Sequence, residues 1–172
     1  MGDVDVSTPR GDFRWHDVPM SHPTARIRHA APGDGARLKE LTAASKAHWG
    51  YDAALVRGWV ETLDFSETRL RADELYVAEV AGRVVGWCEV IPPLDGVCVL
   101  DHLWIEPEWI GRELGSALFQ FGVQRARDLG AGMLEWESEP NAAGFYERMG
   151  GRRLRETTSE WGRPITVMGL DL

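Results

Sequence analysis

The chain is 172 residues long, which suits one domain with a closed hydrophobic core. Its 27 Asp and Glu against 19 Lys and Arg give a net charge of −8, which argues against nucleic acid or an anionic membrane surface as a partner and favours a cationic substrate such as an amine. The sequence contains no apolar run of about 18 residues and no signal-peptide pattern, so we expect a cytoplasmic protein with no membrane partner.

The N-terminal part predicts a tail, one strand and two helices. Residues 1–24 are polar, interrupted by prolines and without periodicity, so we expect a flexible tail in front of a domain of residues 25–172. Residues 24–30 alternate as a strand does. A Pro-Gly-Asp entry then begins a helix that runs to about His48, and a second helix follows with Asp52 as its N-cap.

A hairpin is predicted next, because residues 75–80 and 84–91 are rich in β-branched residues and flank a short glycine turn. Pro92 and Pro93 are expected to end its second strand. Glu89 interrupts that apolar strand. Since a carboxylate is costly to bury unpaired, Glu89 should face an open cleft or have a charged partner.

The two cysteines carry no metal or redox signature. Cys88 and Cys98 lie in apolar, strand-like runs without Cys-x-x-Cys or Cys/His spacing. We therefore expect buried free thiols in a reducing compartment, and no metal site.

Residues 97–130 predict the central feature of the fold. Residues 97–106 have the composition of a buried strand, and Pro107 ends it. A turn with Gly111 and Gly115 leads into a helix with apolar residues at helical spacing, which ends at Gly130. Free N–H groups and the helix dipole at such a helix start form an anion site that suits a pyrophosphate.

The turn at residues 107–118 resembles the acyl-CoA-binding motif of the GNAT superfamily of N-acetyltransferases, whose core pattern is Gln/Arg-x-x-Gly-x-Gly/Ala. Ile110 stands at the first position of that pattern and Glu113 at the first glycine. Backbone donors need no particular side chain, so Ile110 is compatible with the motif. The Glu113 carboxylate is expected near the diphosphate, where it would weaken CoA binding unless it turns outward.

A second resemblance to the same family lies downstream. Residues 133–138 alternate as a strand, and residues 140–151 closely resemble the second GNAT signature, with Gly151 in place of the usual aromatic residue. Together the two motifs cover about a third of the chain, in the family's order. The residues of the second motif that match are Asn141, Phe145, Tyr146 and Gly150.

The resemblance implies an α/β (α+β) GNAT fold, with a central mixed, mostly antiparallel sheet of six to seven strands, a closing C-terminal hairpin and about four flanking helices. It also implies that residues 100–106 separate from residues 133–138, and that the pantetheine arm of acetyl-CoA pairs with strand backbone in the gap. The residues that it assigns to the acetyl-CoA site are Leu103, Trp104, Ile105, Ile110, Gly111, Arg112, Glu113, Leu114, Gly115, Ser116, Asn141 and Tyr146.

The activity implied is direct transfer of an acetyl group from acetyl-CoA, as co-substrate, to a primary amine. Tyr146 is the expected general acid, because a phenol with a pKa of about 10 keeps its proton at neutral pH and can protonate the leaving thiolate. The general base stays open. Its candidates are His102 and Glu89, together with Asp101, Glu135 or Glu137, and water. Strict alternation puts Asp101 and His102 on opposite faces, but a bulge would shift that phase.

Several alternatives stay open. His48, Trp49 and Tyr51 either contact the acceptor or only seal the first helix pair, and Phe145 and Tyr146 either serve the site or only fill the core. A non-catalytic acyl-CoA sensor with the same fold, transfer of a longer acyl group, and O-acylation are the rival functions. The acceptor is undetermined, since fold does not select it, and the family's edge strands allow a homodimer.

Overall fold

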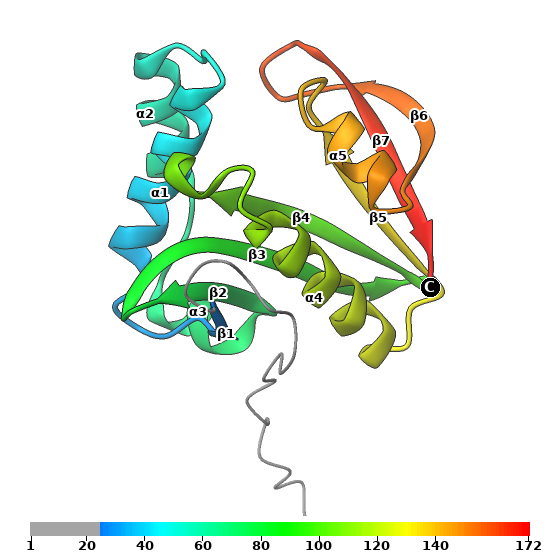
Figure 1. The fold of residues 1–172 in the computed structure, drawn as a ribbon, viewed down its shortest axis with the longest axis horizontal. Helices are drawn as coiled ribbons and strands as arrows, with labels where there is room; N and C mark the ends of the chain where they lie inside the picture. Colours follow the sequence, from blue (N-terminus) through cyan, green and yellow to red (C-terminus); the bar gives the residue numbers. More distant parts are fainter. Residues whose placement is uncertain (1–24) are drawn as a thin grey trace, which may run out of the picture.

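The computed structural model describes residues 25–172, and the predicted N-terminal tail lies outside them (Figure 1). The described part contains seven strands, five α-helices and one short 3-10 helix. In chain order they are β1 (Arg26–His29), α1 (Gly35–His48), α2 (Ala53–Thr62), α3 (Glu67–Ala72), β2 (Leu75–Val80), β3 (Arg83–Leu94), β4 (Val97–Ile105), η1 (Pro107–Trp109), α4 (Leu114–Asp128), β5 (Met133–Ser138), α5 (Ala143–Arg148), β6 (Arg152–Thr158) and β7 (Pro164–Asp171).

The strands form one mixed sheet in the order β1-β2-β3-β4-β5-β7-β6. Neighbouring strands are antiparallel except β4 and β5, which run parallel. A parallel pair needs a crossover, and α4 supplies it across one face of the sheet (Figure 1). The predicted mixed, mostly antiparallel sheet is therefore confirmed, as are the opening strand and the closing hairpin of β6 and β7.

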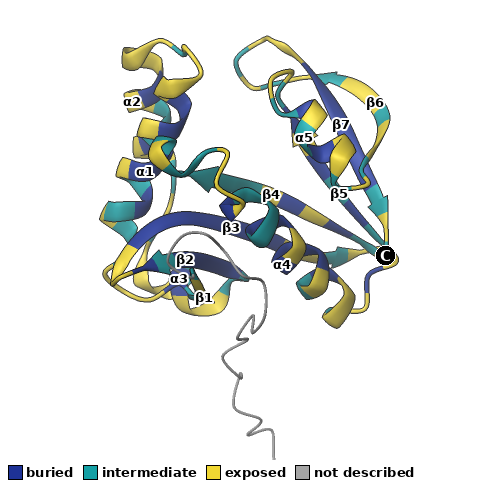
Figure 2. Cartoon of the chain, in the orientation of Figure 1, coloured by how far each residue is buried: buried dark blue, intermediate teal, exposed yellow. Residues whose placement is uncertain are grey.

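Helices cover both faces of the sheet. On one face α4 and α5 contribute Leu118, Phe119 and Tyr146 to the larger hydrophobic core. On the other face Leu38 of α1 and Leu70 of α3 belong to a smaller core. β3 lies between the two cores and its residues 84–90 are all buried (Figure 2). The site described below is built at the rim of these cores, where β4 leaves β5.

A β-bulge in β4 decides which side chains reach the site. Leu100 and His102 take successive positions against β3, so Asp101 is the extra residue. Leu100 and Leu103 both contact the larger core, and Trp104 packs against the smaller core on the opposite face. The shift in alternation thus turns His102 and Trp104 away from α4, and the bulge considered from the sequence is present.

Two local features differ from the sequence-based expectations. Pro92 and Pro93 do not end β3, which continues to Leu94. They lie beyond the end of β2 and at an irregularity in the β3–β4 register, where a missing N–H breaks no ladder bond. The helix α3 was not predicted, because six residues are too few to show a helical period.

Both cysteines are buried and free, as predicted. Burial raises the pKa of the Cys88 thiol to about 12, so it stays protonated and unreactive at neutral pH. Among the described helices, none is long and apolar enough to cross a membrane.

Candidate functional site

The two central parallel strands diverge. β4 pairs with β5 only through Val97, Cys98 and Val99, and in the described structure the register between them ends there. The following residues of β4, up to Ile105, pair on the other side with β3. Their edge toward β5 is therefore free to bind an extended ligand by backbone hydrogen bonds. This gap agrees with the separation that the sequence implied, except that Met133 to Glu135 remain paired.

The start of α4 lies beside the gap. The first backbone bond of the helix runs from the Ala117 N–H to the Glu113 carbonyl, so the N–H groups of Leu114, Gly115 and Ser116 precede the helical ladder. A Cβ at Gly115 would lie 3.0 Å from Ile105 Cδ1 and 3.6 Å from Phe145 Cζ. The glycine thus lets the helix start approach β4 and α5 closely, and it joins the two sequence motifs at one place.

Glu113 replaces a glycine at a position that needs one. Its backbone is left-handed, with φ 63° and ψ −8°, and its side chain makes no capping hydrogen bond. A left-handed conformation is unfavourable for residues with a Cβ, which explains why the family pattern has glycine here. The residue is exposed, so its carboxylate lies in solvent beside the start of α4. Gly111, with φ 77°, supplies the other left-handed turn.

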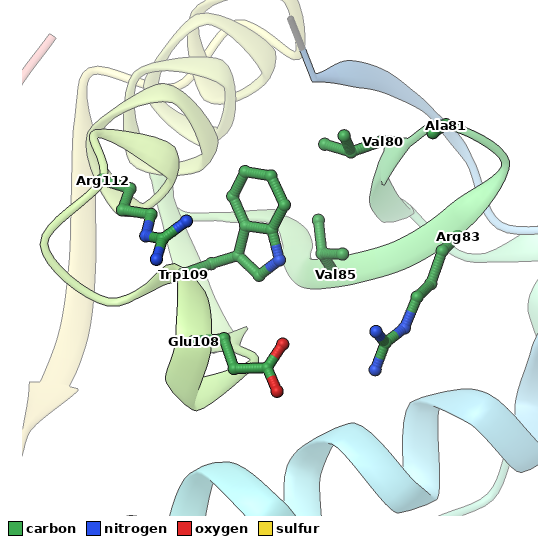
Figure 3. A pocket seen from close by; sticks show the side chains of 7 residues that line it. All are labelled: Val80, Ala81, Arg83, Val85, Glu108, Trp109 and Arg112. Atoms are coloured by element: carbon green, nitrogen blue, oxygen red, sulfur yellow. The ribbon is translucent and has the colours of Figure 1, made fainter. Parts of the chain in front are cut away.

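A shallow pocket of about 470 Å³ borders the same loop (Figure 3). Trp109 and Arg112 turn into it from the loop, and the Arg112 guanidinium lies 5.8 Å from the Trp109 ring centroid. Arg83 enters from the β2–β3 turn. Its lining residues come from η1, the loop and the β2–β3 hairpin, so it is separate from the β4–β5 gap. Of the residues assigned to acetyl-CoA, Arg112 is the one that lines this pocket.

Tyr146 of α5 is buried among aromatic rings. Its ring centroid lies 5.5 Å from that of Phe119, 5.1 Å from Trp136 and 4.9 Å from Phe145. Burial raises its pKa, and the Cys88 thiol adds to that effect, so the phenol keeps its proton at neutral pH. Tyr146 therefore packs against α4, which carries Phe119, and against β5, which carries Trp136. Its packing alone would also fit a core residue.

Asn141 lies in the turn between β5 and α5 and is exposed. The turn follows directly on Glu139, which lines the cavity described next. The two motif residues therefore differ in environment, because Asn141 faces solvent while Tyr146 faces the core.

A cavity of about 520 Å³ opens at the wide end of the gap. Figure 1 shows α2 and the β6–β7 turn facing each other above that end. Its wall includes four carboxylates, and the one lysine among its lining residues leaves them in excess. Residues from α1, α2, β4, β5 and the β6–β7 turn line it, among them Lys46, Tyr51, Trp59, Asp101, His102, Trp104, Glu137, Glu139, Glu160 and Trp161.

Inside this cavity four aromatic rings surround the ammonium group of Lys46. Its side chain is 9% exposed, and Nζ lies 3.8 Å from Glu139 Oε1. Aromatic faces attract cations through their quadrupole, and several rings around one ammonium make a strong site. The distances from Nζ to the ring centroids are 4.6 Å for Tyr51, 4.7 Å for Trp59, 5.2 Å for Trp104 and 4.2 Å for Trp161.

His102 lies between the cavity and a buried carboxylate. Its Nδ1 accepts a hydrogen bond of 3.1 Å from Trp104 Nε1, which assigns the hydrogen of the neutral ring to Nε2. Nε2 is 3.3 Å from Asp101 Oδ2 and 4.0 Å from Glu89 Oε2. Burial lowers the pKa of His102 more than the Asp101 carboxylate raises it, so the ring is neutral at pH 7.

Glu89 has a charged partner rather than an open cleft. Its side chain is 1% exposed, and Arg69 Nη2 donates to Oε1 at 2.5 Å. Burial raises the pKa of Glu89, and Arg69 opposes that shift. Oε2 has no hydrogen-bond partner among the described residues and faces His102. Glu89 is not among the residues that line the cavity, so it can act on an acceptor only through His102.

The three groups Glu89, Asp101 and His102 each bring one ligand atom to within 4.8 Å of the others in the described structure. The charge of Glu89 is already compensated by Arg69, and the Nε2 hydrogen of His102 points at the carboxylates. The arrangement suits proton handling, and we assign no metal to it.

The other sequence candidates separate into two groups. Tyr51 lines the cavity, whereas His48 and Trp49 are not among its lining residues and instead contact each other edge-on, with Trp49 43% exposed. Glu137 lines the cavity, whereas Glu135 pairs with Arg155 at 2.9 Å. Of the three candidates at the end of α1 and in the following loop, Tyr51 is therefore the one that reaches the cavity.

The rings of Tyr51, Trp59, Trp104 and Trp161 form a cage around the Lys46 ammonium. The sequence analysis did not identify Lys46, Trp59 or Trp161 as site residues. Lys46 follows Leu38 and Thr42 on the buried side of α1, so a lysine on an apolar helix face was the available signal. Trp59 lies on α2, where an apolar residue at helical spacing fits the core as well as a site. Trp161 lies in the β6–β7 turn, where sequence offers no period to interpret.

Comparison with known proteins gives a consistent result. Residues 40–151 match the family model described as Acetyltransferase (GNAT) family. Among solved structures, a GCN5-related N-acetyltransferase from Rhodopseudomonas palustris is 25% identical, with 91% of this chain and 99% of that chain covered and a TM-score of 0.72.

Two further structures share the fold at lower identity. The PaiA N-acetyltransferase of Thermoplasma acidophilum, solved in complex with coenzyme A, is 16% identical, with 87% and 99% covered and a TM-score of 0.72. The ribosomal-protein-S18-alanine N-acetyltransferase of Escherichia coli is 14% identical, with 86% and 94% covered and a TM-score of 0.64. The search of curated protein sequences gave no match.

Proposed function

Because the chain belongs to the GNAT family of acetyltransferases, we propose that it transfers an acetyl group from acetyl-CoA directly to a cationic primary amine. One observation carries the proposal. The free edge of β4 lies between a helix start with free N–H groups on one side and an acidic, aromatic cavity on the other. A long thioester with a diphosphate at one end and a reactive carbonyl at the other fits that order of features.

The acetyl-CoA site would use mostly backbone groups. The N–H groups of Leu114, Gly115 and Ser116 would hold the diphosphate at the start of α4, and residues 103–105 of β4 would pair with the pantetheine arm. One of these strand N–H groups would stabilise the oxyanion, a contribution commonly of about 3 kcal/mol. Asn141, exposed beside the gap, would bond a pantetheine amide. The CoA complex of the Thermoplasma acidophilum protein supports the choice of ligand.

The acceptor would be selected by charge and by aromatic contact. The carboxylates of Asp101, Glu137, Glu139 and Glu160 favour an ammonium group over a neutral or anionic acceptor. The rings of the cavity favour an alkylammonium over a strongly hydrated inorganic cation. An aliphatic primary amine with a second positive charge satisfies both.

Two proton transfers would follow from the local geometry. A neutral imidazole at His102 does not repel the incoming ammonium, and its Nε2–H would orient the Asp101 carboxylate, which lines the cavity and would take the proton that the amine must lose. Tyr146, which burial keeps protonated, would return a proton to the departing CoA thiolate. Glu89 would help to orient the His102 ring from the buried side, away from the cavity.

Titration calorimetry with acetyl-CoA, and in parallel with CoA, tests the cofactor half of the proposal. Micromolar binding of both, followed by thiol release with a panel of diamines, monoamines and alcohols, is the expected result. Diamines should react fastest. Binding without turnover on any amine would favour a non-catalytic acyl-CoA sensor, for which the exposed Glu113 carboxylate at the diphosphate site is the supporting observation. Absence of binding would refute the acetyl-CoA proposal.

A further inference from the structure

The amine of Lys46 lies on the wall of the cavity proposed for the acceptor. Its Nζ contacts Trp104, on the strand that borders the gap on one side, and Glu139, which follows β5 on the other side. The amine therefore lies across the mouth of the gap, where the acetyl carbonyl is expected if the proposed function is right. Four aromatic rings and one ion pair hold its ammonium in place.

The surroundings of Lys46 also favour reactivity. An ordinary lysine has a pKa of about 10.4, so at pH 7 roughly one amine in 2,500 is uncharged and nucleophilic. Burial lowers the pKa of Lys46, and the Glu139 carboxylate only partly opposes this. A larger fraction of Lys46 is therefore the free amine, which is the form that attacks a thioester.

We propose that Lys46 is a self-acetylation site, modified by the acetyl-CoA bound to the same molecule. The inference rests on the proposed function. The ammonium gives one proton to water of the cavity, and the neutral Nζ then forms a bond to the thioester carbonyl carbon. The carbon–sulfur bond breaks, CoA leaves as a thiol with a returned proton, and Nζ loses its second proton to become an amide.

Acetylation would change the acceptor site. An acetyl-lysine carries no charge, so the ion pair with Glu139 is lost and the four carboxylates of the cavity face an acceptor without an internal counter-charge. The modified protein should then attract a cationic acceptor more strongly than the unmodified one. Self-acetylation would act as a priming step that is governed by the acetyl-CoA supply.

Lys39 and Lys46 are the only lysines in the sequence, so each lysine acetylation can be assigned to one of two sites. Lys39 is the matched control, since it lies on the same helix but forms an exposed ion pair with Glu61 at 2.9 Å. The purified protein is incubated with acetyl-CoA, and peptide mass spectrometry follows the mass of one acetyl group on each lysine. The same samples are assayed for acetyl-CoA binding and for acetylation of an external diamine.

We expect Lys46 to be acetylated at least tenfold faster than Lys39, with a rate that saturates in acetyl-CoA, falls when CoA is added and does not depend on protein concentration. Lys46→Arg should abolish the modification and Lys39→Arg should leave it unchanged. Binding and external turnover without acetylation of Lys46, or equal rates at both lysines, would overturn this inference alone. Absence of acetyl-CoA binding would overturn the proposed function together with it.

Two more samples test whether the acetylation depends on the folded cavity and whether it changes the acceptor site. Protein unfolded in urea should lose the preference for Lys46, because the preference comes from the folded cavity. Lys46→Gln, which mimics the acetylated side chain, should lower the apparent KM for the diamine by severalfold. Thermal unfolding reports whether each variant keeps the fold.

Discussion

Glu113 combines an unfavourable backbone conformation and an unfavourable charge at one position, and substitutions can separate the two. Relief of the left-handed backbone by Glu113→Gly should stabilise the fold by about 1 kcal/mol, because a residue with a Cβ pays roughly that amount at φ 63°. For a domain of this size the melting temperature should rise by about 2–4 °C.

The charge term acts on the cofactor. One carboxylate at about 6 Å from a doubly charged diphosphate, in a water-like dielectric, costs about 1.4 kcal/mol before screening. Salt at 0.15 M screens charges beyond about 8 Å, so the Kd of acetyl-CoA should fall by about threefold at that ionic strength and by about tenfold at low salt when the charge is removed.

Glu113→Gln is the variant that divides these effects, because it removes the charge and keeps the strained backbone. It should tighten acetyl-CoA binding as much as Glu113→Gly and leave the melting temperature unchanged. Glu108→Gln removes a charge from the neighbouring pocket side of the loop and should leave the Kd unchanged. Calorimetry at two salt concentrations and thermal unfolding measure both terms. A Glu113→Gly protein that melts lower, or a Gln variant with unaltered affinity at low salt, would refute the reasoning.

Three other predictions follow from the same site. Tyr146→Phe should lower kcat by about 10²-fold or more with little change in acetyl-CoA affinity, because a general acid acts only in the transition state. Steady-state rates measure kcat and calorimetry measures the affinity. An unaltered kcat would exclude the phenol from the mechanism. Burial lowers the pKa of His102, so below about pH 6.5 the unfolded chain binds a proton at this residue that the folded chain does not bind. The free energy of unfolding should therefore decrease as the pH falls. Chemical unfolding measured from pH 7.5 to 5.5 should show a smaller decrease in the free energy of unfolding for His102→Gln than for the parent. Arg69→Gln leaves the Glu89 charge buried and unpaired, which should lower the free energy of unfolding by about 3–5 kcal/mol. In urea unfolding, the double variant Arg69→Gln/Glu89→Gln should be closer to the parent in stability. Equal losses of stability in the single and the double variant would contradict the pairing argument.

Local sequence determined much of this protein. The β4 strand, the glycine turn and α4 are contiguous, and their composition, Pro107 and Gly130 mark their limits by rules that act within a few residues. The motifs at residues 107–118 and 140–151 are each a single short stretch of sequence, so each can be identified without knowledge of the fold. Anion binding by backbone N–H groups at a helix start depends on that local geometry, so a site of this kind could be located before any fold was known.

Only the tertiary structure decided the acceptor side. The cage around Lys46 takes Tyr51 from a loop, Trp59 from α2, Trp104 from β4 and Trp161 from a distant turn. No sequence period links residues so far apart, because their proximity comes from the packing of helices and strands on one sheet. The partner of Glu89 was open for the same reason, since Arg69 is on a helix too short to predict. The β4 bulge then set the faces: one extra residue reverses every following side chain, which turned His102 and Trp104 toward the cavity.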